Sequence, residues 1–220
     1  REDGGGSQVR VDYDDALELL DSDLDEAIVK AGAALAVLDE DEAAGELMYI
    51  HQLVQEYFAA RELAEKPNPE LVRVEWRAAA VRPSVAEVHA GLGGGDTLPP
   101  LPQTGWEETT LLAAAMAADG EAFLRGVMGT NLVVAGRAAV QAELRGRLPE
   151  SFLDELRAAL LARCRDPQAD LRERLAAGFA LGHLGDPRFE RRMGPEGAYL
   201  LPPLVAIPGG AYPIGDDDPI

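Results

Sequence analysis

Apolar residues recur at helical spacing over most of the chain. Near the start they predict two short helices, at residues 14–20 and 24–31, and a longer helix at residues 52–64. Strand-like runs at residues 33–38 and 47–50 flank a polar, acidic turn. Later in the chain helix follows helix almost without interruption, over the ranges 107–118, 121–128, 132–145, 151–163 and 171–184. The pattern predicts a mainly α protein with one small two-stranded wing.

Capping residues mark several of the predicted helix ends. Gly32 is placed to end the second helix. Ser84 and Glu87 have the spacing of a capping box, which predicts a helix start inside an otherwise irregular connector. Asp170 is expected to cap the last helix, with Glu173 in its first turn. These residues indicate where helices begin and end, which apolar spacing alone does not.

The most specific motif lies where the second predicted strand meets the long helix. The apolar run at residues 47–50 ends at a histidine, and an amphipathic helix follows directly. This order resembles the strand-to-helix junction of the winged-helix subdomain in NACHT-type STAND NTPases, with the approximate pattern Phe-x-His-x-x-x-Gln-Glu-Tyr-Phe-Ala-Ala. The residues that match are His51, Gln55, Glu56, Tyr57, Phe58, Ala59 and Ala60. Ile50 stands where the pattern usually has an aromatic residue.

His51 is the candidate cofactor-binding residue. In the family, the histidine at this place approaches the β-phosphate of bound ADP and helps to hold the closed, inactive state. The resemblance therefore implies ADP or ATP as the cofactor of the full-length protein. An imidazole N–H can donate to a phosphate oxygen, and a nearby helix N-terminus favours an anion. The alternative is a purely structural histidine at a helix start. No catalytic or metal-ligating residue is predicted.

The helices after residue 106 carry a second resemblance. Residues 172–188 are similar to the second helix of a HEAT repeat and its turn, because small residues line one helix face. Small residues allow the close helix stacking that a solenoid requires, although only one such repeat is recognisable. The proline-rich entry to Trp106 resembles the helical region that follows the winged helix in bacterial NACHT proteins. A proline-rich peptide ligand is the alternative for this entry.

The tail changes character at Tyr199. Residues 199–215 resemble the opening of a formylglycine-generating-enzyme-type (sulfatase-modifying) domain, whose pattern is near Val-x-Ile-Pro-Gly-Gly-x-Phe-x-Met-Gly. Tyr212 and Ile214 replace the Phe and Met of that pattern. We expect only the start of such a domain to be present. The apolar residues of this tail are expected to pack against the preceding helices, on an extended path imposed by four prolines.

The composition of the chain argues against several classes of protein. A hydrophobic fraction of 47% argues against general disorder, and the formal net charge of −19 opposes binding to nucleic-acid phosphates. No apolar run is long enough to span a bilayer, and no signal-peptide pattern opens the chain. The single cysteine, Cys164, excludes an intramolecular disulfide, fits a reducing cytoplasmic location and is expected to be a small buried hydrophobe. The acidic clusters are expected to be solvated helix ends and turns.

These patterns predict five parts. The first three are a linker at 1–11, a winged-helix subdomain at 12–65 and a connector at 66–105. The last two are a HEAT-like helical arm at 106–190 and the start of a formylglycine-generating-enzyme-like domain at 191–220. The glycine-rich residues 91–96 lack the Gly-Lys-Ser/Thr ending of a P-loop, so the chain itself is not expected to be an enzyme or to hydrolyse ATP.

The resemblances imply a regulatory segment of a bacterial STAND NTPase, in defence or signalling. The partners implied are an upstream NTPase domain and a downstream formylglycine-generating-enzyme-like domain of the same polypeptide, with homo-oligomerisation on activation. No membrane partner is expected. Two alternatives remain open. The helical arm could be a scaffold for a catalytic or ligand-binding formylglycine-generating-enzyme-type domain, or a protein-interaction solenoid without nucleotide dependence.

Overall fold

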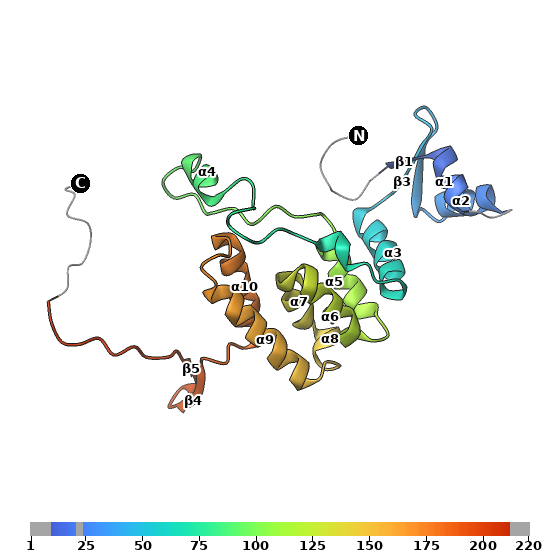
Figure 1. Cartoon of the computed structure of the whole chain (residues 1–220). Helices are drawn as coiled ribbons and strands as arrows, with labels where there is room; N and C mark the ends of the chain where they lie inside the picture. Colours follow the sequence, from blue (N-terminus) through green and yellow to red (C-terminus); the bar gives the residue numbers. More distant parts are fainter. Residues whose placement is uncertain (1–9, 21–23, 212–220) are drawn as a thin grey trace. The chain divides into compact units, whose positions relative to one another are not determined.

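The computed structural model describes residues 10–20 and 24–211. Over these residues the chain is mainly helical, which confirms the predicted fold class at that level, and it contains ten α-helices. The chain divides into two compact units, with the boundary after Gly185 (Figure 1). No helix among the described residues is both long and apolar enough to cross a membrane.

The N-terminal region, residues 10–50, is a small sheet with two helices beside it (Figure 1). Its elements in chain order are β1 (Arg10–Asp12), α1 (Tyr13–Leu20), α2 (Asp25–Ala34), β2 (Leu38–Asp41) and β3 (Glu46–Tyr49). The sheet is antiparallel with strand order β1-β3-β2. The last strand, β3, therefore pairs with the first strand, β1, although α1, α2 and β2 lie between them in sequence. Leu47 on β3 and Val29 on α2 are each only 3% exposed and form its small core.

The predicted two-stranded hairpin is present as β2–β3, with two corrections. The first strand begins at Leu38 instead of residue 33, because α2 continues to Ala34. Gly32 therefore does not end the helix. A Cβ at Gly32 would lie 2.7 Å from Leu38 Cδ1, so glycine here permits close packing of the helix on the strand. The sheet also has a third strand, β1, at residues that the sequence pattern assigned to the linker and the start of the next domain.

Helix α3 (Gln52–Glu65) follows the sheet, as predicted, and packs along α5. Ala60 is fully buried and Leu63 is 8% exposed, so the C-terminal half of α3 belongs to the main core. The connector after α3 contains a short 3-10 helix, η1 (Pro69–Val72), and α4 (Val85–Ala90). The predicted capping box is confirmed, since the Ser84 hydroxyl accepts from Glu87 N and the Glu87 carboxylate accepts from Ser84 N.

Six helices form the array that follows the connector. They are α5 (Glu107–Met116), α6 (Gly120–Thr130), α7 (Leu132–Ala139), α8 (Ala142–Arg145), α9 (Glu150–Arg165) and α10 (Leu171–Leu184). The predicted helix at 132–145 is divided, because Gln141 takes an extended backbone conformation. After this break α8 places Leu144 in the core, where it is fully buried. Trp106 and Cys164 are partly buried against the same core.

Helix α7 is the centre of the array and packs against α5, α6, α9 and α10. Six of its eight residues are buried, and Arg137 on its remaining face is exposed enough to pair with Glu108. At Gly136 a Cβ would lie 3.0 Å from Ala180 Cβ and 3.1 Å from Leu160 Cδ1. The absence of a side chain at Gly136 therefore sets the distance at which α7 meets α9 and α10.

The second unit contains a hairpin of β4 (Glu190–Gly194) and β5 (Gly197–Leu201), which the sequence pattern did not predict. Residues 202–211 have no regular secondary structure. The expected burial of the tail is not found, since Leu204, Val205 and Ile207 are all more than 70% exposed. Tyr212 and Ile214 of the proposed domain opening lie outside the described residues.

We predict that Gly136→Leu destabilises the array by about 1–3 kcal/mol or more, because the added side chain overlaps Ala180 and Leu160. The matched control is Gly129→Leu on α6, where nothing lies within 4 Å of the Cβ position. Urea unfolding of both variants measures the difference as a change in midpoint. Equal midpoints for the two variants would contradict a close approach of helices at Gly136.

Candidate functional site

His51 lies at the N-cap position of α3, immediately after the sheet. Its side chain is exposed, and Nδ1 accepts a hydrogen bond of 3.1 Å from the backbone N–H of Leu53. Because Nδ1 is the acceptor, the neutral ring carries its proton on Nε2. The Nε2–H takes no part in this cap and is therefore a donor available to a ligand, at the N-terminal end of α3 where the helix dipole favours an anion.

The motif residues around His51 fall into two groups. Towards the N-terminus of α3 apolar side chains are exposed, with Ile50 at 51%, Leu53 at 63% and Tyr57 at 46%. Phe58 stacks on Tyr49 of β3 with ring centroids 6.0 Å apart, which fixes α3 to the sheet. Towards its C-terminus, Ala60 is buried in the array core. One helix thus presents His51 at an exposed end and anchors its other end in the array.

A second candidate is an apolar hollow of about 390 Å³ in the N-terminal region, called here the α1–α2 hollow. Its floor includes the buried residues Val29 and Leu47, whereas Leu19 at 80% and Ile28 at 46% exposed stand at its open side. The lining residues are Arg10, Val11, Ala16, Leu19, Leu20, Ile28, Val29, Leu38, Leu47, Met48, Tyr49 and Gln55. The sequence pattern assigned these residues to the linker, the two short helices, the two strand-like runs and the long helix. The available signal was the group of leucines interspersed among Asp and Glu in residues 14–28.

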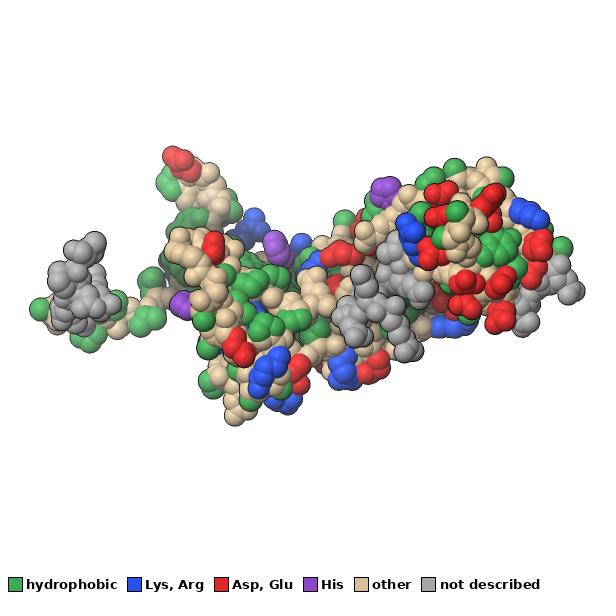
Figure 2. Space-filling view, turned by 90° about the horizontal axis from the view of Figure 1, so that it is seen from above, with side chains coloured by type: hydrophobic (Ala, Val, Ile, Leu, Met, Phe, Trp, Pro, Cys, Tyr) green, Lys and Arg blue, Asp and Glu red, His purple; other side chains and the backbone are tan. Residues whose placement is uncertain are grey.

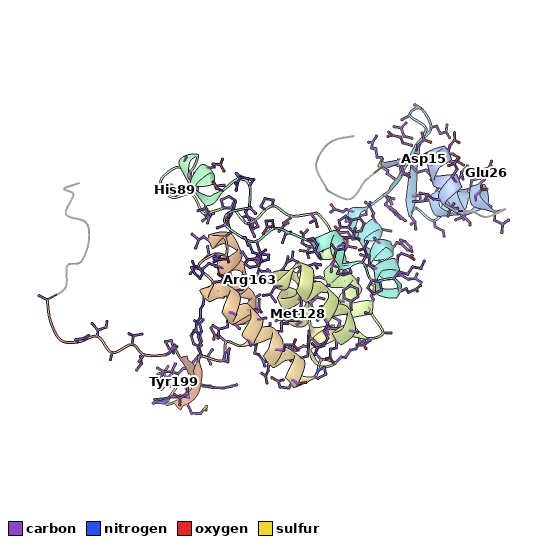
Figure 3. All side chains as sticks on the ribbon, viewed as in Figure 1. Asp15, Glu26, His89, Met128, Arg163 and Tyr199 are labelled. Atoms are coloured by element: carbon purple, nitrogen blue, oxygen red, sulfur yellow. The ribbon has the colours of Figure 1, made fainter. Side chains whose placement is uncertain are left out.

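A third group is buried where the connector meets α9 and α10. Asp170 and Arg172 form an ion pair with side chains 1% and 2% exposed and an Oδ1···Nε distance of 2.9 Å. Glu173 pairs with Arg163 at 2.6 Å, and the Arg163 guanidinium lies 3.5 Å from the ring centroid of Trp76 (Figure 3). Asp170 N also donates to the Trp76 carbonyl.

The buried group fastens the connector to the array. Arg172 donates to the carbonyl of Pro83, and Arg77 and Ala169 form an antiparallel bridge. No buried side-chain nitrogen or oxygen among the described residues lacks a hydrogen-bond partner. Asp170 caps α10 as predicted by accepting from Arg172 N, and Glu173 lies in the first turn as predicted, where its carboxylate also pairs with Arg163. Because every charge is matched internally, we assign these residues a structural role.

Burial and ion pairing shift the pKa values of Asp170 and Glu173 in opposite directions. The hydrogen bonds from Arg172 hold the pKa of Asp170 below its ordinary value of 3.8. Loss of solvent raises the pKa of Glu173 above its ordinary value of 4.5, although Arg163 opposes the change. The contribution of Asp170 to stability is therefore present above its ordinary pKa and is lost as pH falls through the lowered value. That of Glu173 declines as pH rises through its raised value.

A metal centre has no support in the part of the chain that the structure describes. Within residues 10–20 and 24–211, no group of three or more His, Cys, Asp or Glu side chains is arranged to hold a metal ion. The acidic residues of the N-terminal region instead accept hydrogen bonds in turns, as when Asp12 Oδ1 accepts from Asp14 N and Asp41 Oδ1 from Ala44 N.

We predict that Asp170→Asn destabilises the array by about 3–5 kcal/mol, because it leaves the buried Arg172 charge without its partner. The stability of the variant should also fall less steeply with pH below 3.8, the ordinary pKa of Asp, because the variant has no carboxyl group at position 170 to protonate. Denaturant unfolding from pH 3 to pH 7 measures both effects. The control Glu155→Gln removes an exposed pair with Arg125 and should cost no more than about 1 kcal/mol. Similar losses in both variants would show that the Asp170 pair is not set apart by burial.

We predict that His51→Ala frays the first turn of α3 at a cost of about 1 kcal/mol, the usual value of an N-cap. His51→Asn should preserve the turn, since Asn is a good capping residue. Amide hydrogen exchange at Leu53 is the direct measurement, because that N–H donates to His51. Exchange at Leu53 that is unchanged in the alanine variant would contradict the capping role.

Comparison of the chain with known protein families, with curated proteins and with solved structures finds no match. The functional interpretation therefore depends on the residues and the geometry described above.

Proposed function

We propose that the chain is a regulatory segment of a bacterial NACHT-type STAND NTPase. In this proposal, residues 10–65 form a winged-helix element that holds the ATPase closed in its ADP-bound state. The helical array behind it relays ligand sensing to nucleotide exchange and oligomerisation. The observation that carries the proposal is the placement of His51, exposed at the N-cap of α3 with Nε2 as its donor.

The topology of the N-terminal region supports the winged-helix part of the proposal. A helix pair lies between a first strand and a β-hairpin, and the first strand pairs with the last one. The β2–β3 hairpin then corresponds to the wing, and α3 corresponds to the helix that leaves it. In this arrangement His51 lies in the short segment that connects β3 to α3.

The chemistry of the His51 site supports ADP as the ligand. The imidazole Nε2–H is a donor suited to a phosphate oxygen, and the N-terminal end of the α3 dipole favours an anion. The acidic charge of the region opposes an isolated phosphate, so the nucleotide must be held chiefly by an ATPase domain. His51 would then add one contact that exists only when the two domains are closed on each other, which is what a nucleotide-controlled switch requires.

The packing of α3 into the helical array supports the proposed relay of ligand sensing. Helix α3 is anchored at Ala60 and Leu63 in the same core that α7 organises, so movement of α3 displaces packed helices and not a flexible link. Packed cores move as rigid bodies with few alternative arrangements. A change at the His51 end can therefore be transmitted through α5 and α7 to α10.

We predict that His51→Asn in the full-length protein weakens ADP binding about 10- to 100-fold and raises basal activity. Asn keeps the N-cap, but its amide N–H lies closer to the backbone than the Nε2–H of His51 and does not reach the same phosphate oxygen, and a hydrogen bond to a charged group contributes about 1.5–3 kcal/mol. Titration with a fluorescent ADP measures the affinity.

The control for this experiment is His89→Asn, on the exposed face of α4 (Figure 3). The control should bind ADP as the wild type does. If His51→Asn also retains wild-type ADP affinity and basal activity, while His51→Ala lowers thermal stability, His51 is a helix cap only and the proposal fails.

A further inference from the structure

The geometry points to a docking site for a basic amphipathic helix from another protein in the α1–α2 hollow. This inference goes beyond the proposed function, since it involves neither His51 nor a nucleotide. It depends on two observations, the apolar lining of the hollow and the acidic surface around it.

The lining of the hollow fits apolar side chains and little else. Ten of its lining residues are apolar, and its two polar residues are Arg10 and Gln55. Arg10 is already paired with Glu46 at 3.0 Å, so the hollow presents few polar groups to orient a small polar metabolite. Leu19 and Ile28 lie on opposite helices at its open side and remain exposed, which is costly unless something covers them.

The surface around the hollow is strongly negative. Residues 10–50 contain thirteen Asp and Glu but only two Lys and Arg, which accounts for eleven of the nineteen net negative charges of the chain. Both cations are already paired within the region, Arg10 with Glu46 and Lys30 with Glu26. Figure 2 shows acidic side chains gathered around hydrophobic ones on this region, and Figure 3 labels Asp15 on α1 and Glu26 on α2.

The apolar lining and the acidic surface together indicate which kind of partner fits the α1–α2 hollow. A helix with an apolar stripe can insert side chains at i, i+3, i+4 and i+7 between α1 and α2, while Lys or Arg on its flanks meets the acidic rim. A second copy of this chain would bring the same negative region against itself and be repelled. An anionic membrane surface would be repelled for the same reason. A basic amphipathic helix satisfies both the apolar floor and the charged rim.

The test uses the whole 220-residue chain and three labelled synthetic helical peptides of equal length. The first has a Leu stripe with Lys flanks, the second the same stripe with Glu flanks, and the third the same Lys residues with Ser in place of Leu. Fluorescence anisotropy measures binding. We expect the Leu/Lys peptide to bind, and each of the other two to bind at least about tenfold more weakly. Raising the salt concentration should weaken the Leu/Lys complex.

A pair of variants locates the site. Ile28→Asp places a charge at the open side of the hollow and should weaken Leu/Lys binding at least about tenfold, although it adds an attractive charge to the surface. Leu35→Asp adds the same charge at an exposed apolar residue of the region that does not line the hollow, and should leave binding unchanged. Circular dichroism checks that both variants remain folded.

Three results would overturn the inference. Equal binding of the Ser/Lys peptide would mean that the acidic surface attracts cations without using the hollow. Equal effects of Ile28→Asp and Leu35→Asp would place the binding elsewhere. A concentration-dependent dimer that Ile28→Asp abolishes would mean that the hollow is covered by a second copy of the chain. None of these results depends on ADP, so failure here is distinguishable from failure of the His51 proposal.

Discussion

The close approach of α7 to α9 and α10 at Gly136 is the constraint on which the helical array depends. A helix with six of its eight residues buried can contact four neighbours only if its side chains are small where the neighbours come nearest. Ala135, Ala138 and Ala139, all fully buried, continue this small surface. Asn131 extends the same packing to the connector, because its Nδ2 donates to the Val72 carbonyl while its Oδ1 caps α7. The core of the main unit is therefore organised around one short helix.

The connector is held by charges instead of by apolar packing alone. The Asp170–Arg172 pair is buried and the Arg163–Glu173 pair is mostly buried, and each contacts connector residues through Pro83 or Trp76. Buried pairs of this kind contribute little net stability, but removing one partner is costly. They therefore fix where residues 73–83 lie on α9 and α10. A segment with little secondary structure of its own becomes part of a rigid scaffold.

The N-terminal region has the opposite character, with a small core, a large negative charge and exposed apolar side chains. It contains the α1–α2 hollow, and His51, the other feature for which we propose a partner, follows it directly in the chain. Helix α3 joins it to the array, with its exposed His51 end next to the sheet and its buried Ala60 end in the core. A weakly stabilised element attached to a rigid one is the arrangement in which binding can shift the position of the first relative to the second.

The sequence by itself determined the helices whose ends carry local signals. The Ser84–Glu87 capping box and the Asp170 cap depend on residues three or fewer positions apart, so they could be recognised without the fold. Tertiary structure decided what depends on distant residues. Strand β1 exists because β3 pairs with it, Gly32 lies inside α2 where it lets Leu38 pack closely, and Glu173 in the first turn of α10 finds its partner in Arg163 of α9. The sequence identified His51 as a candidate, but only the fold shows which ring nitrogen is left to donate and that the hollow between α1 and α2 is open.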